Sequence, residues 1–462
     1  MGPHLPMATS VQKAVEQSLS TGMPFHTLVT LAAVAFLGTL VVSRLAIQLR
    51  LPAVLGVLLL GLALHPGQRI LTLQEVENLH VVSLSMLLFC SGLNANLHHL
   101  RGYLRYGVLL AIGGLVVSSL LLGGLIWGVY AGLTALVPGG TGLIPLPLSV
   151  ALMAATCLSC TDAAPALQLL RRARLLLDVR LRALLELESS LNDPLAILLL
   201  LLLVGLSTTG SQLHTASTEL GGTLGVLQSF LKSIGSGITV GLILTFVAQF
   251  ILRRFVSNGN QILLLGISVA LSSYGLANLL HGSGFISAYV TGLFLANDIY
   301  SNKWITPALL ENSLEPFNTL MEFSVFLLFG TLIQPVNALH ALLPGLLIGL
   351  GLILIVRPLS VLAVQRFSPL SQREGWLLAW CGLRGAVPLA LAYTTIHTLP
   401  MLPGLNEATV KVLEAQLEGL VVVVVVVVLA VQGLSLPAVS RRLGLTLADG
   451  TAALTTAPEA NA

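Results

Sequence analysis

The chain alternates between long apolar runs and short polar stretches over most of its length. A transmembrane helix needs roughly 20 apolar residues, and the runs predict about thirteen helical spans joined by short turns. Residues 1–24 are more polar and lack the order of a cleaved signal, so we expect a polar N-terminal leader. The predicted spans are 25–43, 51–65, 79–97, 104–136, 147–170, 183–205, 223–252, 260–280, 284–298, 317–334, 340–365, 374–398 and 410–436.

The composition agrees with this pattern. The 462 residues are 55% hydrophobic and 9% charged, and the mean hydropathy is +0.93, whereas soluble domains carry about 25% charged residues. The predicted fold class is an all-α polytopic membrane protein surrounded by a lipid bilayer. A scattered net charge of +3 gives no indication of nucleic-acid binding. The four cysteines lie in apolar runs without matching histidines, so we expect neither a disulfide framework nor a zinc site.

Basic residues in short loops stay on the cytoplasmic side of a membrane. Most of the 22 lysines and arginines fall in loops on one predicted side, including five arginines between 171 and 182, whereas few fall on the other. The N-terminus is therefore predicted outside and the C-terminus, with a short tail over 441–462, in the cytoplasm. The valine run 421–428 is interpreted as part of a lipid-facing last span.

Charged side chains within a span are costly and mark functional candidates. We count five of them: Asp162, Glu188, Asp193, Arg357 and Arg384. Asp193 lies about ten residues into its span, which is roughly 15 Å of helix rise in a hydrocarbon core about 30 Å thick. The sequence therefore places Asp193 near the middle of the membrane.

The segment Glu188-Ser-Ser-Leu-Asn-Asp-Pro194 gathers polar groups on one helix. Residues four apart share a helix face, so Ser189 lies below Asp193 and Glu188 lies below Asn192. Pro194 removes a backbone donor and is expected to loosen nearby carbonyls. Carboxylate, hydroxyl and carbonyl oxygens are ligands for a hard cation.

Two other spans contain helix-breaking patterns at mid-depth. The fifth carries Ser159-Cys-Thr-Asp-Ala-Ala-Pro165, and the twelfth carries Gly382-Leu-Arg-Gly-Ala-Val-Pro388. Interrupted helices in corresponding positions of two halves indicate a transporter built from inverted repeats. The fifth and twelfth spans differ by seven, an odd number, so the second half would be inverted relative to the first.

Three other classes of protein remain to be weighed. An intramembrane aspartyl protease needs two carboxylates that share a proton on facing helices, but its usual Tyr-Asp and Gly-x-Gly-Asp patterns are absent. A passive channel is less compatible with single broken helices than alternating access is. A membrane sensor that transports nothing stays open as an alternative, and the overall interpretation is a transporter and not an enzyme.

At these residues the chain resembles the monovalent cation:proton antiporter-1 family of the NhaP type. The most specific pieces are Glu188–Pro194, close to the family's E-S-x-x-N-D followed by Ala or Pro, and Gly382–Val387, close to its G-L-R-G-A-V. Thr161-Asp162 and Arg357-Pro358 add support. At the position where members often carry an acid in the third span, this chain has Cys90-Ser91.

The resemblance implies a thirteen-span antiporter that forms a homodimer and has crossed breaks in its fifth and twelfth spans. The antiporter domain would cover 25–440, with transport helices around 79–205 and 317–436 and the other helices forming a scaffold. It also implies the roles of individual residues. Asp193 would carry the cation and the proton, and Ser189, Thr161 and Asp162 would add oxygens. Asn192 would hold the first break, Glu188 would pair with Arg357, and Arg384 would stand beside the second break.

The function expected from this resemblance is electroneutral exchange of one monovalent cation for one proton by alternating access. Na⁺ is the expected cation and K⁺ is the alternative, with Li⁺ also possible by chemistry. Proton and cation would compete for the Asp193 carboxylate, and the ions are cargo, so no cofactor is expected. The location would be the bacterial inner membrane.

Overall fold

The computed structural model describes residues 25–64, 73–95, 104–136, 143–209, 219–297, 306–366 and 370–448. The predicted leader 1–24 and the end of the predicted tail lie outside these ranges. The described helices are α2 (Phe25–Gln48), α3 (Ala53–Ala63), α4 (Leu73–Asn94), α5 (Leu104–Leu136), α6 (Leu148–Ser159), α7 (Ala163–Arg172), α8 (Val179–Thr209), α9 (Glu219–Phe255), α10 (Gly259–Leu279), α11 (Gly284–Ala296), α12 (Pro307–Leu332), α13 (Pro335–His340), α14 (Leu342–Gly351), α15 (Arg357–Gln365), α16 (Gln372–Trp380), α17 (Ala386–Thr398) and α18 (Glu407–Leu443).

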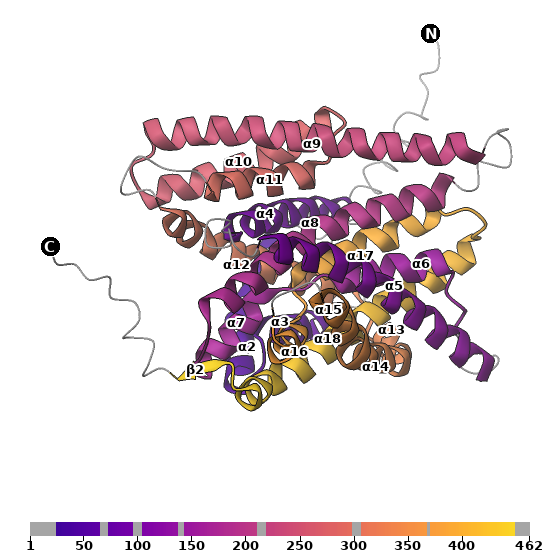
Figure 1. Cartoon of the computed structure of the whole chain (residues 1–462). Helices are drawn as coiled ribbons and strands as arrows, with labels where there is room; N and C mark the ends of the chain where they lie inside the picture. Colours follow the sequence, from indigo (N-terminus) through magenta and orange to yellow (C-terminus); the bar gives the residue numbers. More distant parts are fainter. Residues whose placement is uncertain are drawn as a thin grey trace, which may run out of the picture.

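Each predicted span corresponds to one helix or to helices that follow each other within the span, so the predicted all-α polytopic fold is confirmed (Figure 1). Within the described ranges, six of these helices and the continuous run Leu342–Gln365, which joins α14 to α15, are long and apolar enough to cross a membrane, and shorter apolar helices lie among them. The predicted span 340–365 is divided by one π-helical turn at Leu352–Val356. The predicted span 317–334 belongs to a helix that begins earlier, at Pro307.

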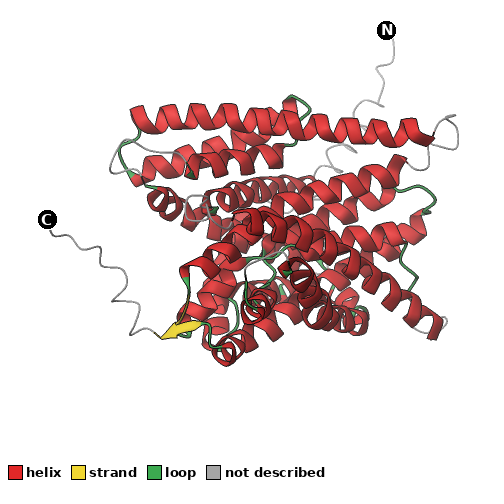
Figure 2. Cartoon of the chain, in the orientation of Figure 1, coloured by secondary structure: helices red, strands yellow, loops and turns green. Residues whose placement is uncertain are grey.

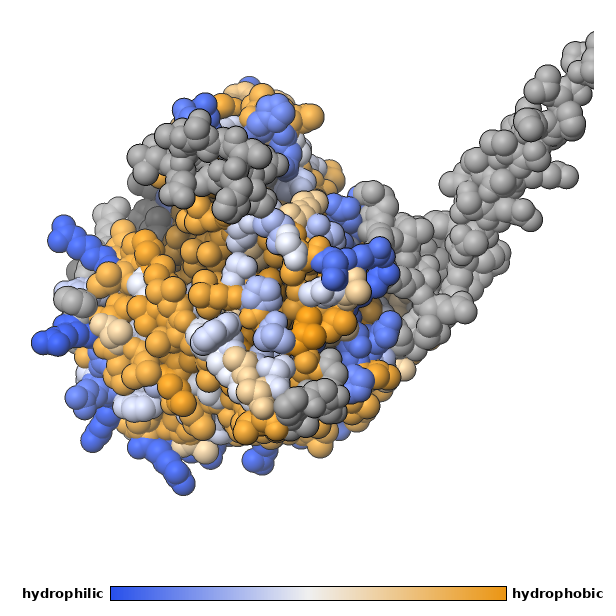
Figure 3. Space-filling view, turned by 90° about the vertical axis from the view of Figure 1, so that its right-hand side faces the viewer, coloured by the Kyte–Doolittle hydropathy of each residue, from blue (hydrophilic) through white to orange (hydrophobic). Residues whose placement is uncertain are grey.

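Much of the molecular surface is apolar. Figure 3 shows a largely hydrophobic face with hydrophilic side chains along its border. Long helices such as α9 expose large side chains, among them Phe246 and Phe250. Soluble monomeric proteins rarely expose a continuous apolar surface of this size, whereas such a surface is favourable in contact with the acyl chains of a bilayer.

Two close helix contacts reveal the repeat within the chain. α3 crosses α12 so closely that a Cβ on Gly61 would collide with the backbone of Gly330, and α4 crosses α11 in the same way through Gly92 and Gly292. α3 and α4 are the second and third spans, and α11 and α12 are the ninth and tenth. A shift of seven spans therefore relates α3 to α11 and α4 to α12. Each crossing joins one helix of the first half to one helix of the second, and the seven-span shift exchanges the two crossings, as an inverted repeat requires.

The fifth and twelfth predicted spans are both interrupted at mid-depth. α6 and α7 are separated by Cys160–Asp162, and α16 and α17 by Cys381–Gly385. The two extended segments cross, and the backbone N–H of Asp162 donates a 2.8 Å hydrogen bond to the carbonyl of Leu383. The predicted pair of crossed breaks is confirmed.

The valine run in α18 is not lipid-facing, so this expectation was wrong. Most of residues 421–428 are buried inside the bundle, because α14 packs along them. Gly345 and Gly349 of α14 leave room for Val423 and Val427. Small residues on one helix allow branched residues on its neighbour to approach closely.

One small sheet departs from the all-helical pattern (Figure 2). Strand β1 (Leu175–Leu177), between α7 and α8, pairs antiparallel with β2 (Thr446–Ala448), which follows α18. Leu176 lies opposite Leu447. The start of the predicted tail is therefore ordered against the connection between two helices of the candidate site.

Candidate functional site

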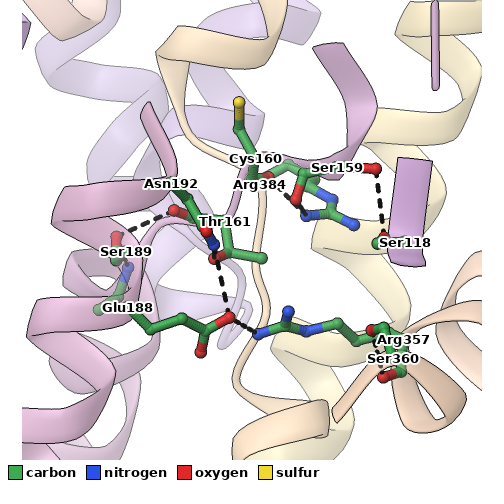
Figure 4. Close-up of polar contacts among 11 residues, drawn as sticks. Ser118, Ser159, Cys160, Thr161, Glu188, Ser189, Asn192, Arg357, Ser360 and Arg384 are labelled. Atoms are coloured by element: carbon green, nitrogen blue, oxygen red, sulfur yellow. Dashed lines mark hydrogen bonds and ion pairs between the residues drawn. The ribbon is translucent and has the colours of Figure 1, made fainter. Parts of the chain in front are cut away.

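The site is built around one uninterrupted helix, α8, and the two crossed breaks. α8 runs through Pro194 without a break, although proline removes a donor from the helix. Glu188, Ser189, Asn192 and Asp193 project from its middle, and Glu188, Asn192 and Asp193 are all buried. Figure 4 shows several of these side chains directed toward the first break.

Ser189 and Asn192 hold the first break against α8. The Ser189 hydroxyl accepts a hydrogen bond from the backbone N–H of Ala163 (3.0 Å) and donates one to the carbonyl of Thr161 (2.9 Å). The Asn192 amide donates to the Thr161 hydroxyl at 3.0 Å. An interrupted helix leaves backbone groups without partners, and α8 supplies partners for those on both sides of Asp162.

Glu188 and Arg357 form a salt bridge of 2.5 Å between Oε1 and a guanidinium nitrogen (Figure 4). The two side chains are 1% and 3% exposed, so the pair lies in a dry environment where an unpaired charge would be very costly. The Asn192 amide also donates to Glu188, at 3.4 Å. Arg357 follows the π-helical turn, which fits the missing donor of Pro358 one residue later.

Arg384 lies in the second break and reaches across to the end of α6. Its guanidinium donates to the carbonyl of Ser159 at 3.0 Å and to the carbonyl of Cys160. These carbonyls are at the negative end of the helix dipole, where a cation is stabilising. Arg384 therefore closes α6 from the opposite break.

Asp162 lies on the other side of the first break, at the N-terminal end of α7. Its carboxylate accepts a 2.9 Å hydrogen bond from the backbone N–H of Ala164 and forms the N-cap of α7. The same carboxylate lies against Gly385, the N-cap of α17, where a Cβ would collide with it. A negative charge is favourable at a helix N-terminus, and Asp162 lies beside two of them.

Asp193 is 9% exposed and stands apart from this network. Its Oδ2 accepts a 3.2 Å hydrogen bond from Ser91 of α4. Among the described residues it has no ion-pair partner. Ser189 and Thr161 are in direct contact. That they join Asp193 in binding a cation stays a prediction.

Three contacts around Asp193 escaped the sequence analysis. Besides Ser91, Ser190 donates to the Ser91 carbonyl at 2.5 Å and lies 3.4 Å from the hydroxyl of Tyr289. These residues join α4, α8 and α11 beside the carboxylate. The sequence did place Cys90-Ser91 where family members often carry an acid, but the residues alone could not show that the Ser91 hydroxyl contacts Asp193.

The count of five intramembrane charges was wrong, because α12 also carries Glu322 inside the predicted span 317–334. Glu322 lines a cavity together with residues of α2, α3 and α7. Its position in an otherwise apolar run was the signal that could have identified it. No group of His, Cys, Asp and Glu suited to a bound metal ion occurs within the described ranges, and a transported cation would be cargo.

The comparisons with known proteins agree with this geometry. Residues 32–442 match the family model described as sodium/hydrogen exchanger, transmembrane. The chain is 32% identical over 416 residues to the K(+)/H(+) antiporter NhaP2 of Shewanella sp. strain MR-4, a match that covers 89% of this chain and 65% of that protein. The chain thus spans about two thirds of the length of such curated relatives.

Two further similarities come from a curated relative and a solved structure. The chain is 27% identical over 430 residues to the Na(+)/H(+) antiporter NhaS2 of Synechocystis sp. strain PCC 6803, covering 91% of this chain and 71% of the relative. The fold matches the sodium proton antiporter MjNhaP1 from Methanocaldococcus jannaschii with a TM-score of 0.75 at 21% identity, covering 91% of this chain and 99% of the other.

The family resemblance drawn from the two motifs is confirmed by the family match and the relatives. The family is one of transporters and not of enzymes, so the aspartyl protease alternative is set aside. The chain is a multi-pass membrane protein, and it belongs to the sodium/hydrogen exchanger family.

Proposed function

We propose that this protein exchanges a monovalent cation for a proton across the membrane by alternating access, with Asp193 as the shared binding site. The observation that carries the proposal is the difference between the two buried carboxylates of α8. Glu188 is neutralised by Arg357, whereas Asp193 has no ion-pair partner within the described part of the chain.

A buried carboxylate without a cationic partner is stabilised either by a proton or by a bound cation. The two therefore compete, and each neutralises the same single charge. If the empty, charged site is too costly to carry across the barrier, only the loaded forms reorient, and exchange becomes obligatory. Because one carboxylate binds either one proton or one monovalent cation, one proton is exchanged for one cation and no net charge moves.

The ligands of the cation in this proposal are oxygens of Asp193, Ser189 and Thr161, with Asp162 acting directly or through water. Ser189 and Thr161 already bond to each other at the first break, so any movement that releases them frees oxygens toward Asp193. Na⁺ is the proposed cation, in line with the printed names of NhaS2 and MjNhaP1. K⁺ is the alternative, since the NhaP2 relatives carry it in their name.

Reconstitution in liposomes with an internal pH dye tests the proposal. After a proton gradient is imposed, Na⁺, K⁺ or Li⁺ is added in turn, and valinomycin with K⁺ controls the membrane voltage. We expect cation-dependent proton movement that does not change with voltage. The cation that acts at the lowest concentration identifies the substrate.

The Asp193→Asn variant should lose exchange almost completely while remaining folded, because an amide can neither take up a proton nor balance a cation. Asp178→Asn is the matched control, because Asp178 lies just before α8, outside the predicted span, and makes the same change in charge. Normal exchange by Asp193→Asn would refute the assignment. No proton movement with any cation from folded wild-type protein would favour a sensor that transports nothing.

The location and assembly are also part of the proposal. We place the protein in the bacterial inner membrane as a homodimer, with the N-terminus outside and the C-terminus in the cytoplasm. A single cysteine at Lys411 should then react with an impermeant reagent added to intact cells, and one at Arg253 should not. The opposite labelling pattern would invert the topology.

A further inference from the structure

A cavity of about 220 Å³ opens beside the first break, between α7 on one side and α2, α3 and α12 on the other. Its polar lining includes Ser43, Gln168, Arg172, Thr319 and Glu322. One water occupies about 30 Å³ in the liquid, so the cavity has room for a cation with part of its hydration shell.

The cavity belongs to the end of the molecule that is predicted to face the cytoplasm. It is bordered by the C-terminal part of α2 and the C-terminal end of α7, where Arg171 and Arg172 lie. Toward the opposite end, the His80 ring of α4 lies against the ring of Tyr393 of α17, with centroids 5.0 Å apart and planes tilted by 40°, and its Nε2 lies 3.3 Å from the Thr394 hydroxyl.

Glu322 is the carboxylate of this cavity. Unlike Glu188, it forms no ion pair within the described ranges, and Arg172 on the same lining does not neutralise it by a salt bridge. The cavity also touches Ala164 and Pro165 at the start of α7, directly after Asp162, which is the N-cap of this helix. The cavity therefore extends from Glu322 to the first break, which α8 holds through Ser189.

We propose that Glu322 is a second cation-binding residue, which holds a partly hydrated monovalent cation in the cavity before the cation moves to Asp193. The hydroxyl oxygens of Ser43 and Thr319 and the amide oxygen of Gln168 complete the oxygen lining that such an ion requires. This proposal rests on the proposed function. It differs from the role of Asp193, because Glu322 binds the cation only before the cation reaches the carboxylate that exchanges it for a proton.

The test compares Glu322→Gln with Glu315→Gln in liposomes. Glu315 is exposed on the same helix and undergoes the same change in charge. Because a carboxylate raises the local cation concentration in a cleft, we expect Glu322→Gln to raise the half-saturating cation concentration about threefold or more. The maximal rate should be retained, and Glu315→Gln and Glu322→Asp should resemble the wild type.

Two results in this assay would overturn the entry site. One is an unchanged half-saturating concentration in Glu322→Gln while the wild type exchanges cations. The other is a lower maximal rate of folded Glu322→Gln at an unchanged half-saturating concentration, which would make Glu322 part of the reorienting carrier.

A binding measurement separates this proposal from the function itself. In the Asp193→Asn background, thermal unfolding is measured in detergent with increasing Na⁺ or K⁺. We expect a cation-dependent rise in the unfolding temperature that disappears on adding Glu322→Gln. The same rise with and without Glu322 would refute the site even if exchange were confirmed. A rise that depends on Glu322 would support it even if exchange were never observed.

Discussion

The two interrupted spans are built to the same local plan but carry opposite charges. In each, an N-cap residue is followed by alanine, a second small or branched residue and a proline at the third helical position: Asp162 to Pro165 and Gly385 to Pro388. The N-cap is an aspartate in the first and a glycine in the second. Because Asp162 fills the space beside Gly385, only one side chain fits where the breaks cross.

The charged side chain of each break lies at a half-helix end that belongs to the other interrupted span. Arg384 of the second break bonds to the C-terminal end of α6 in the fifth span. Asp162 of the first break lies beside the N-terminal start of α17 in the twelfth span. Half-helices expose unpaired carbonyls and N–H groups at membrane depth. Each break is therefore stabilised in part by a side chain from the other.

The largest expected effect comes from removing the ion pair that supports both breaks. Arg357 pairs with Glu188 beside the first break, and its Nε lies only 2.7 Å from where a Cβ on Gly382 of the second break would be. Arg357→Ala strands a buried charge and should cost about 3–5 kcal/mol. We expect loss of folded protein in size-exclusion chromatography and thermal unfolding.

Arg366→Ala is the matched control, since Arg366 is exposed at the end of the same helix. Adding Glu188→Gln to Arg357→Ala should recover part of the stability, because the stranded charge is then gone. A stable, monodisperse Arg357→Ala protein would contradict the role assigned to the pair.

A smaller effect should follow from Gly385→Ala, which disturbs only the crossing point. Gly385 has an ordinary extended conformation (φ −94°), so the penalty is the collision of the new methyl group with Asp162. Overpacking of this kind costs about 1–3 kcal/mol. We expect a lower unfolding temperature and slower exchange, whereas Gly128→Ala, with open space around it, should leave both unchanged.

Exchanging the two N-caps sharpens the comparison. The Gly385→Asp variant should be poorly folded, and adding Asp162→Gly should restore folding, because the double variant again places one acid at the crossing. If the double variant folds no better than Gly385→Asp alone, the two N-cap positions are not equivalent, and the shared plan of the breaks is wrong.

The sequence predicted the spans and both breaks because apolar length and helix-breaking residues act locally. It could not show that Pro194 leaves α8 intact while the spans of Pro165 and Pro388 are broken, because the difference depends on partners from other helices. Glu322 and the contact of Ser91 with Asp193 were missed for a similar reason, since they depend on the cavity and on the packing of α4 against α8. The valine run was misjudged because burial depends on which helix packs beside it.

The smallest effect should come from Ser189→Ala, which weakens the first break and leaves the second untouched. The variant loses the hydrogen bonds to Ala163 N–H and to the Thr161 carbonyl. The stranded groups belong to Thr161 and Ala163, which are both buried, and a lost hydrogen bond costs about 1 kcal/mol, so we expect a total cost of about 1–2 kcal/mol. Thermal unfolding should show this modest loss. Thr208→Ala, near the end of the same helix, loses hydrogen bonds to the carbonyls of Val204 and Gly205 and should not slow exchange. If Ser189→Ala slowed exchange no more than Thr208→Ala, α8 would not be what holds the first break in its transport-competent form.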